Sequence, residues 1–254
     1  MYVDSHCHID SREYDNIEKV IERAIDNNVK ILIVNGYDRR SNSEVLELVK
    51  KYDIVYGAIG WQPGEIDDIS EEDYLFLENH INDKKIVAIG EIGLDYHYEG
   101  YDKDKQIEVF KRQIDIANMY NKPVIVHTRD AIQDTYDILK IKNARGVIHC
   151  YSGSLEMAKQ FINIEFCLGI GGICTFKNAN NIIKVIKSIP LEYIVLETDS
   201  PYLAPEPFRG HKNEPKNIPL IANKIAEIKG ISVENVKSVT TTNIRRVFDK
   251  INNI

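Results

Sequence analysis

DSHCHID, residues 4–10, places two histidines one residue apart close to the start of the chain. Residues 1–3 are apolar, and one interpretation is a β-strand that runs from them through His6 and His8. Side chains of a strand alternate between its two faces, so both imidazoles would point one way and Cys7 the other. Two imidazoles on one face can hold one metal ion. An exposed, irregular terminus with incidental histidines is the alternative that this stretch alone leaves open.

Short apolar runs alternate with longer amphipathic stretches along the whole chain. Apolar residues at three- and four-residue spacing, as in 17–25 and 107–117, predict helices with one buried face. Strands that are apolar on both faces and alternate with helices form a parallel sheet. Eight such units allow either a closed (β/α)8 barrel or an open doubly wound sheet. The apolar runs are residues 1–6, 30–36, 54–60, 85–93, 123–128, 146–150, 165–172 and 192–199.

Polar side chains recur at the carboxyl ends of these predicted strands, where parallel α/β folds build their sites. A single histidine at the end of an apolar strand is more often a hydrogen-bonded structural residue than a ligand. Six metal-binding side chains in the same position indicate a common site. They are His6, His8, Glu91, His127, His149 and Asp199.

This set of side chains suits two metal ions. Neutral imidazole and carboxylate are ligands for Zn²⁺, Mn²⁺, Ni²⁺ or Co²⁺, and a carboxylate can bridge two ions about 3.5–4 Å apart. A water bound to both ions would lose its proton near neutral pH and act as a nucleophile. The predicted arrangement has one ion on His6, His8 and Asp199 and the other on His127 and His149, with Glu91 between them.

The same arrangement decides between the two folds. His6 lies on the first predicted strand and Asp199 on the last, and only a closed barrel puts these strands side by side. The sequence therefore predicts one (β/α)8 TIM-type barrel domain over residues 1–254, with the metal site at the carboxyl ends of its strands. Five prolines between Pro201 and Pro219 predict a long ordered loop. Helical spacing returns in residues 223–248, which should complete the outer ring.

Composition excludes several classes of protein. The net charge of −7 argues against nucleic-acid binding through a general basic surface, yet it leaves room for a local cationic pocket or one charged by metal ions. The chain has no apolar run long enough to span a membrane, and residues 1–10 do not resemble a signal peptide. We therefore expect a cytoplasmic protein. Four cysteines without CxxC spacing are expected to be reduced and buried.

Several stretches of the sequence, taken in order, resemble the TatD-type deoxyribonucleases, a branch of the metal-dependent amidohydrolase superfamily. They are DSHCHID (4–10), GEIGLDY (90–96), PVIVHTRDA (123–131), GVIHCYSGS (146–154), LETDSPYLAP (196–205), RGHKNEP (209–215) and SVTTTNIRRVF (238–248). The resemblance implies the same six metal ligands that the strand ends indicate.

The resemblance also implies an activity. Members of this family are associated with 3′-to-5′ exonuclease action, so we expect hydrolysis of DNA phosphodiester bonds at chain ends, with single-stranded ends as the favoured substrate, by a metal-bound hydroxide. Asp199 and Glu91 would be the catalytic side chains, and Mg²⁺ joins the candidate metals. One departure is visible. Family members commonly have Gly-x-His-Pro where this chain has GWQP (60–63), and Gln62 cannot carry the positive charge of a histidine.

Several residues near the predicted ligands could contact an anionic substrate. Arg129 could grip a phosphate through paired hydrogen bonds, although an ion pair with Asp130 or another nearby carboxylate is an equal alternative. Asp4 and Asp95 could orient histidines from behind. The remaining predicted substrate contacts are Ser152, Lys177, Tyr202, Arg209, Lys212 and Asn213, with Tyr151 and His211 beside them.

Two other functions stay open at this point. The same metal pair could hydrolyse a carboxylic ester, a lactone or an amide, including the ester bond of an aminoacyl-tRNA. A non-catalytic, metal-dependent binding protein is the second alternative, and Asp199, placed to accept a proton, argues against it. No membrane and no obligatory protein partner is indicated.

Overall fold

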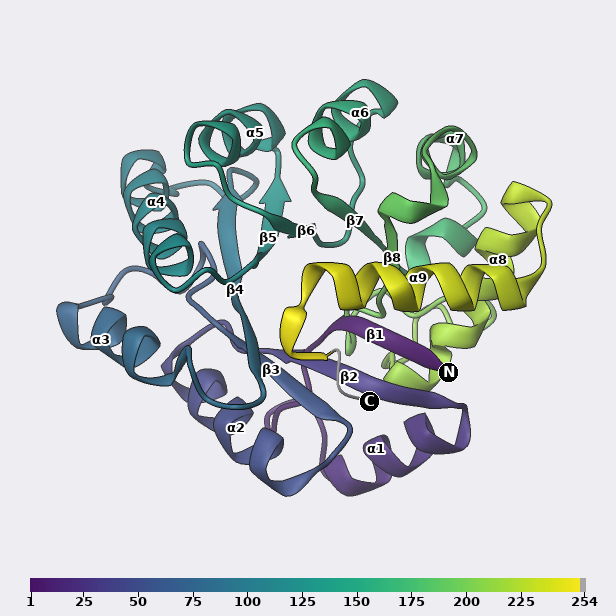
Figure 1. Ribbon diagram of the computed structural model, residues 1–254, viewed down its shortest axis with the longest axis horizontal. Helices are drawn as coiled ribbons and strands as arrows, with labels where there is room; N and C mark the ends of the chain where they lie inside the picture. The colour runs from purple at the N-terminus through teal and green to yellow at the C-terminus, as the bar shows by residue number, and fades with distance from the viewer. Residues whose placement is uncertain (252–254) are drawn as a thin grey trace.

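Eight parallel strands form one sheet in sequence order, β1 to β8 (Figure 1). The computed structural model describes residues 1–251. Each strand overlaps one of the apolar runs found in the sequence. The strands are β1 (Tyr2–Cys7), β2 (Val29–Asn35), β3 (Val55–Ile59), β4 (Ile86–Asp95), β5 (Val124–Arg129), β6 (Gly146–Ile148), β7 (Cys167–Ile170) and β8 (Ile194–Leu196).

The first strand meets the end of the last one, which closes the sheet into a barrel. Cys7 forms a parallel bridge with Ser200, and the His8 amide donates to the Ser200 carbonyl at 2.7 Å. The buried Asp4 carboxylate strengthens the seam, because it accepts hydrogen bonds from the Thr198 amide at 3.0 Å and the Thr198 hydroxyl at 2.6 Å. The predicted (β/α)8 barrel is confirmed.

Helices surround the strands as an outer ring, α1 to α8 (Figure 1). Side-chain caps fix several of their starts: Asp38, for example, accepts from the Ser41 amide at 2.6 Å at the start of α2. The helices are α1 (Ile17–Asp26), α2 (Arg39–Lys51), α3 (Glu71–His80), α4 (Lys103–Met119), α5 (Ile132–Ile141), α6 (Leu155–Asn163), α7 (Asn180–Ser188), α8 (Ile218–Lys229) and α9 (Val233–Val247), with short 3₁₀ turns at η1 (Gly172–Thr175), η2 (Leu191–Tyr193), η3 (Pro215–Asn217) and η4 (Asp249–Ile251).

The loop after β8 is shorter than predicted, because the last two prolines of the proline-rich segment lie in helical turns. Pro215 begins the 3₁₀ turn η3, and Pro219 lies in the first turn of α8. Proline is tolerated there because the first amides of a helix have no intrahelical acceptor. Along residues 1–251, each helix is too short or too polar to cross a membrane.

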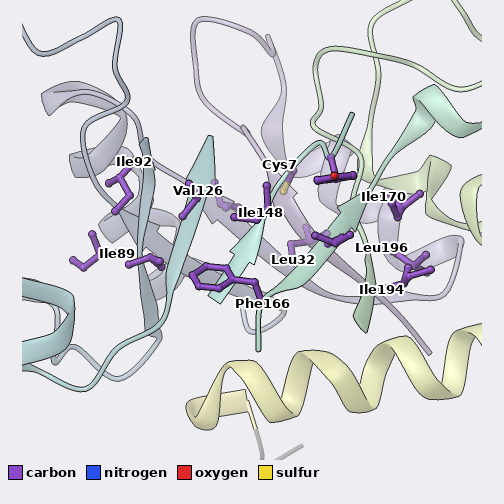
Figure 2. Packing of buried hydrophobic residues seen from close by; sticks show 14 of the residues in the cluster. Cys7, Leu32, Ile89, Ile92, Val126, Ile148, Phe166, Ile170, Ile194 and Leu196 are labelled. Atoms are coloured by element: carbon purple, nitrogen blue, oxygen red, sulfur yellow. The ribbon is translucent and has the colours of Figure 1, made fainter. Parts of the chain in front are cut away.

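The larger apolar core lies between the strands and the ring of helices. Figure 2 shows part of it, with Cys7, Leu32, Ile148 and Leu196 on four strands of the barrel. Buried residues of the helices, such as Phe110 and Phe161, belong to the same cluster. This layer fixes the strands and therefore the positions of the side chains at their carboxyl ends.

A second apolar cluster fills the amino-terminal end of the barrel. It joins inward residues such as Ile31 and Val147 to Ile244 and Phe248 at the end of α9. The chain reverses between α8 and α9 at Gly230, whose φ of 67° favours glycine. The predicted completion of the ring thus applies to α8, whereas α9 crosses the base of the barrel (Figure 1).

Candidate metal centre

An irregularity in β1 turns His6, and His8 directly after the strand, into the barrel. Asp4 pairs with Leu32 and Cys7 with Val34, so β1 holds one more residue than β2 over this interval. Such a bulge shifts the alternation of side chains. Val3 therefore belongs to the cluster inside the base, whereas Cys7 packs on the helix side of the sheet. As predicted, His6 and His8 converge, with their Nε2 atoms 3.0 Å apart.

A second irregularity presents Glu91 to the same space. Ile89 pairs with Val124 and Ile92 with Val126, so β4 also carries one extra residue. Gly90 makes this possible, because a Cβ atom on it would lie 2.7 Å from the Cβ of Ile125. Bulges beside a site commonly redirect a side chain in this way.

One oxygen of Glu91 faces the histidines of β1. Its Oε2 atom lies 3.5 Å from His6 Nε2 and 3.2 Å from His8 Nε2. Asp199, just beyond β8, completes this half of the cluster, since its Oδ1 atom is 3.7 Å from His6 Nε2 and 3.8 Å from His8 Nε2. Three of the predicted ligands therefore surround one point beside Glu91 Oε2.

The other oxygen of Glu91 faces the histidines that end β5 and follow β6. Its Oε1 atom lies 3.1 Å from His127 Nδ1 and 3.2 Å from His149 Nε2, and these two nitrogens are 3.2 Å apart. The rings of His6 and His149 stack at 3.9 Å and join the two halves. Glu91 thus lies between the two groups of ligands that the sequence predicts.

Hydrogen bonds behind the rings fix two of the histidines. His127 Nε2 lies 3.1 Å from Asp95 Oδ2, which agrees with the predicted orienting role of Asp95. The side chain of Gln106 holds Asp95 in place, because its Oε1 atom accepts from the Asp95 amide and its Nε2 atom donates to the Asp95 carbonyl, at 2.8 Å each. His8 Nδ1 is 2.9 Å from the Asn35 carbonyl oxygen. These contacts set which ring nitrogen faces the cluster.

Burial and mutual charge shift the pKa values of these groups in the metal-free protein. Burial alone would raise the pKa of Glu91, but the charge of His149 and hydrogen bonds from the surrounding imidazoles hold it well below its usual range. Burial also opposes the charged forms of His8 and His127, yet their bonds to carboxylates raise the pKa of each to about 9. Burial lowers the pKa of His6 and raises that of Asp199.

The donor set fits divalent metal ions. Three overlapping groups have ligand atoms within 4.8 Å of one another: His6–His8–Glu91, His6–His149–Asp199 and Glu91–His127–His149. Imidazole nitrogen and carboxylate oxygen are the ligands that first-row divalent ions prefer. Nearly all of these side chains are buried, so their ligand atoms are held close together by the surrounding structure.

Exposed cations and aromatic rings stand on the loops that surround this cluster. Arg129 donates to the Tyr98 hydroxyl at 3.3 Å, with its guanidinium 5.3 Å from that ring. Arg209 lies 4.3 Å from the ring of Phe176. The ring of Tyr202, 53% exposed, is 6.4 Å from that of His8. Ser152 and Lys177 are also exposed on loops after strands.

The ion pair weighed for Arg129 does not form among the residues described. Asp130 instead binds His97 Nδ1 at 2.8 Å, which leaves the guanidinium at the rim. Asp4 also differs from expectation, because it accepts from the His6 backbone amide at 3.3 Å and from Thr198 and so holds the seam of the barrel, whereas an imidazole partner was predicted.

Two predicted substrate contacts are engaged elsewhere. The buried amide of Asn213 donates to the carbonyls of Thr198 and Tyr202 at 2.8 Å each, and its oxygen accepts from Glu214 and Asn217. Asn213 therefore holds the loop after β8 together, and its role in substrate binding stays a prediction. Lys212 is exposed but pairs with Glu13, 199 positions away in sequence, at 3.5 Å.

Glu197 belongs to the centre but was missed from the sequence. It is completely buried, two residues before Asp199, and accepts from the Cys150 amide at 2.6 Å. Burial, reinforced by the charge of Asp199, raises its pKa well above the usual range. Alternation would have placed residues 195, 197 and 199 on the same inward face.

Comparison with known proteins now identifies the family. The model of the TatD-related DNases matches residues 3–249. This chain belongs to the TatD-related DNase family. It is 42% identical to the uncharacterized metal-dependent hydrolase YabD of Bacillus subtilis, over 98% of this chain and 99% of that protein. It is 37% identical to the uncharacterized metal-dependent hydrolase YcfH of Escherichia coli K12, over 97% and 95%.

The fold of this chain agrees with a solved structure of the family. The crystal structure of YjjV, a TatD homologue from Escherichia coli K12, superposes with a TM-score of 0.93 at 28% identity and covers 98% of both chains. The protein is a TatD-family metal-dependent hydrolase, and the resemblance seen in its sequence is confirmed. Gln62 stays a departure at the mouth, where its backbone amide donates to the Tyr37 carbonyl at 3.1 Å.

Proposed function

We propose that this TatD-family hydrolase cleaves DNA phosphodiester bonds at chain ends, as a 3′-to-5′ exonuclease that uses two divalent ions. The observation that carries the proposal is the position of Glu91, whose two oxygens each face a pair of histidines at 3.1–3.5 Å. Two such half-sites on one carboxylate suit a metal pair that acts on both the attacking and the leaving oxygen of a phosphodiester.

The proposal divides the ligands between two half-sites. His6, His8 and Asp199 would hold one ion, His127 and His149 the other, and Glu91 would reach both. Ions of this kind supply Lewis acidity toward water and phosphoryl oxygens. Their identity is open among Zn²⁺, Mn²⁺, Mg²⁺, Ni²⁺ and Co²⁺.

Asp199 is the group best placed to accept a proton from the attacking water. Its side chain is 13% exposed, against 7% for Glu91, so it faces the mouth of the barrel more than the bridging carboxylate does. In the metal-free protein, burial raises the pKa of its carboxyl group. Its backbone amide, bonded to the His6 carbonyl at 3.0 Å, keeps it beside β1.

The rim of the mouth supports a phosphate-bearing substrate. Arg129 ends β5 and Arg209 lies on the loop after β8, and each stands beside an exposed or half-buried aromatic ring. A guanidinium binds phosphate oxygens through paired hydrogen bonds, and aromatic rings stack on unpaired bases. A terminal nucleotide of a single strand can enter such a mouth, whereas the interior of a duplex is too wide.

The substitution Arg129→Ala tests the substrate class. Loss of a phosphate contact should lower kcat/KM on an end-labelled oligonucleotide roughly 10-fold or more, about 1.4 kcal/mol, and reduce its salt dependence. Hydrolysis of a small neutral ester should change little. Arg112→Ala is the matched control, because Arg112 lies 3.6 Å from the ring of Tyr74 on the outer ring of helices.

Other outcomes would contradict the assignment. An equal loss on both substrates would mean that Arg129 only supports the structure. If ester, lactone or aminoacyl-tRNA turnover by the unmodified protein far exceeded DNA turnover, the carboxylic-ester hydrolase would replace the nuclease. Metal binding without turnover of any of these substrates would favour a binding protein.

A further inference from the structure

The four histidines of the centre differ in what lies behind each ring. The far nitrogen of His127 faces the Asp95 carboxylate at 3.1 Å, and that of His8 faces the Asn35 carbonyl at 2.9 Å. The Nδ1 atoms of His6 and His149 are buried and have no hydrogen-bond partner within residues 1–251. A buried polar atom without a partner is costly, so each of the two needs an explanation.

Glu197 lies behind the ring of His149. Its Oε1 atom is 3.9 Å from His149 Nδ1, beyond hydrogen-bond distance, and its Oε2 atom is buried without a partner in the described part of the chain. Gly169 leaves room for this carboxyl group, because a Cβ atom on residue 169 would lie 2.0 Å from Glu197 Oε2. The unpartnered Nδ1 of His149 thus lies beside a carboxyl group whose Oε2 atom is also unpartnered, in a space that Gly169 leaves open.

We propose that Glu197 is a positioning residue that accepts a hydrogen bond from His149 Nδ1–H when His149 Nε2 holds a metal ion. The inference rests on the metal pair of the proposed function, and on neither its substrate nor its direction of cleavage. A small rotation of the two side chains shortens the 3.9 Å separation to a hydrogen bond. The Cys150 amide, which donates to Glu197 at 2.6 Å, keeps the carboxyl group at the base of the ring.

This contact makes the two half-sites unequal. Both histidines beside Glu91 Oε1 then have a carboxyl group behind them, Asp95 for His127 and Glu197 for His149. On the other side, the Asn35 carbonyl oxygen lies behind His8. A carboxylate behind a ligating imidazole raises its basicity and fixes its tautomer, and loss of such a partner commonly costs 10- to 100-fold in metal affinity. Glu197 therefore strengthens the half-site of β5 and β6 selectively.

Cobalt titration of the metal-free protein tests the inference, with the d–d absorption of bound Co²⁺ as the signal. Glu197→Gln keeps the size and an acceptor oxygen but cannot form a carboxylate. We expect it to lower the affinity for one of the two Co²⁺ ions roughly 10- to 100-fold and that for the other less than about threefold. Asp95→Asn should weaken the same ion. Asp73→Asn is the matched control. Asp73 is a buried carboxylate on α3 that pairs with Arg39 of α2, and its substitution should change neither Co²⁺ affinity.

A structural role would give a different pattern. If Glu197 only supports the backbone at Cys150, Glu197→Gln should lower the melting temperature and leave both Co²⁺ affinities unchanged, or weaken both alike, and either result would overturn the proposal. Co²⁺ binding needs no DNA, so a failure of the nuclease assignment leaves this readout intact.

A measurement on the unmutated protein guards against a variant that does not fold. In the Zn²⁺-loaded protein, ¹⁵N spectra of the histidine rings should show a slowly exchanging, hydrogen-bonded proton on Nδ1 of His149. Metal on Nδ1 of His149, or an Nδ1 proton that exchanges as fast as one in water, would contradict the assignment.

Discussion

Inward-facing side chains line both ends of the barrel, but those at the base are apolar and those at the mouth are polar or charged. At the base, Ile31, Val147 and Phe248 form an apolar cluster closed by α9. At the mouth, His127, His149 and other polar side chains gather around Glu91 with little apolar packing between them.

The difference shows how one scaffold separates stability from chemistry. Apolar burial at the base contributes stability and does not depend on the exact direction of each contact. The mouth, in contrast, must hold charged and polar atoms at defined positions. The bulges at His6 and Glu91 lie on the mouth side of their strands, where they turn ligands inward. Substitutions at the two ends should therefore have separable effects.

The largest effect is expected from Asp199→Asn at the mouth. Asparagine keeps the shape but is a poorer ligand and cannot accept the proton of the attacking water, so turnover should fall roughly 100- to 10,000-fold. The ion held by His127, His149 and Glu91 should stay bound, and thermal unfolding should change little. Activity close to that of the unmodified protein would show that Asp199 is not the base.

A comparable effect on stability, with none on chemistry, is expected from Phe248→Ala at the base. Phe248 is completely buried under the barrel, and truncation of such a side chain commonly lowers the free energy of unfolding by about 3–5 kcal/mol. Urea unfolding measures the loss. Turnover and metal affinity per folded molecule should be unchanged. A fall in metal affinity would mean that the two ends are coupled through the strands.

A smaller effect, about tenfold per pH unit, is expected for metal loading. In the metal-free protein His8 and His127 have pKa values of about 9, so below that pH each carries a proton that a metal ion must displace. Apparent Mn²⁺ affinity should fall as the pH is lowered from 9 to 6, with about one proton released per ion at pH 7. Affinity that is constant over this range would contradict the assigned ligand set.

Much of the fold was predictable because its strands carry a strong signal. Strands such as β2 and β5 are apolar on both faces, and their spacing requires helices between them. The path of α9 was not predictable, since the turn at Gly230 and the cluster around Phe248 depend on contacts far apart in sequence. The domain limits of 1–254, the cytoplasmic location and the lack of an obligatory protein partner stay predictions.

The site was predictable where strand ends decide it and less so elsewhere. His6 and Glu91 lie in the second halves of β1 and β4, and Asp199 follows β8, so the barrel topology brings all three to the same end. Glu197 was overlooked because it continues an apolar strand and precedes a more conspicuous aspartate. The internal hydrogen bonds of Asn213 were not predictable, because the direction of a loop side chain depends on long-range contacts.

The most direct test of the account is anomalous diffraction from crystals loaded with Mn²⁺ or Zn²⁺. Two full peaks per chain are expected, about 3.5–4 Å apart, one beside each oxygen of Glu91. One peak should lie near His6, His8 and Asp199 and the other near His127 and His149. A single fully occupied ion that contacts all six residues would contradict the two-ion centre on which the proposed chemistry depends.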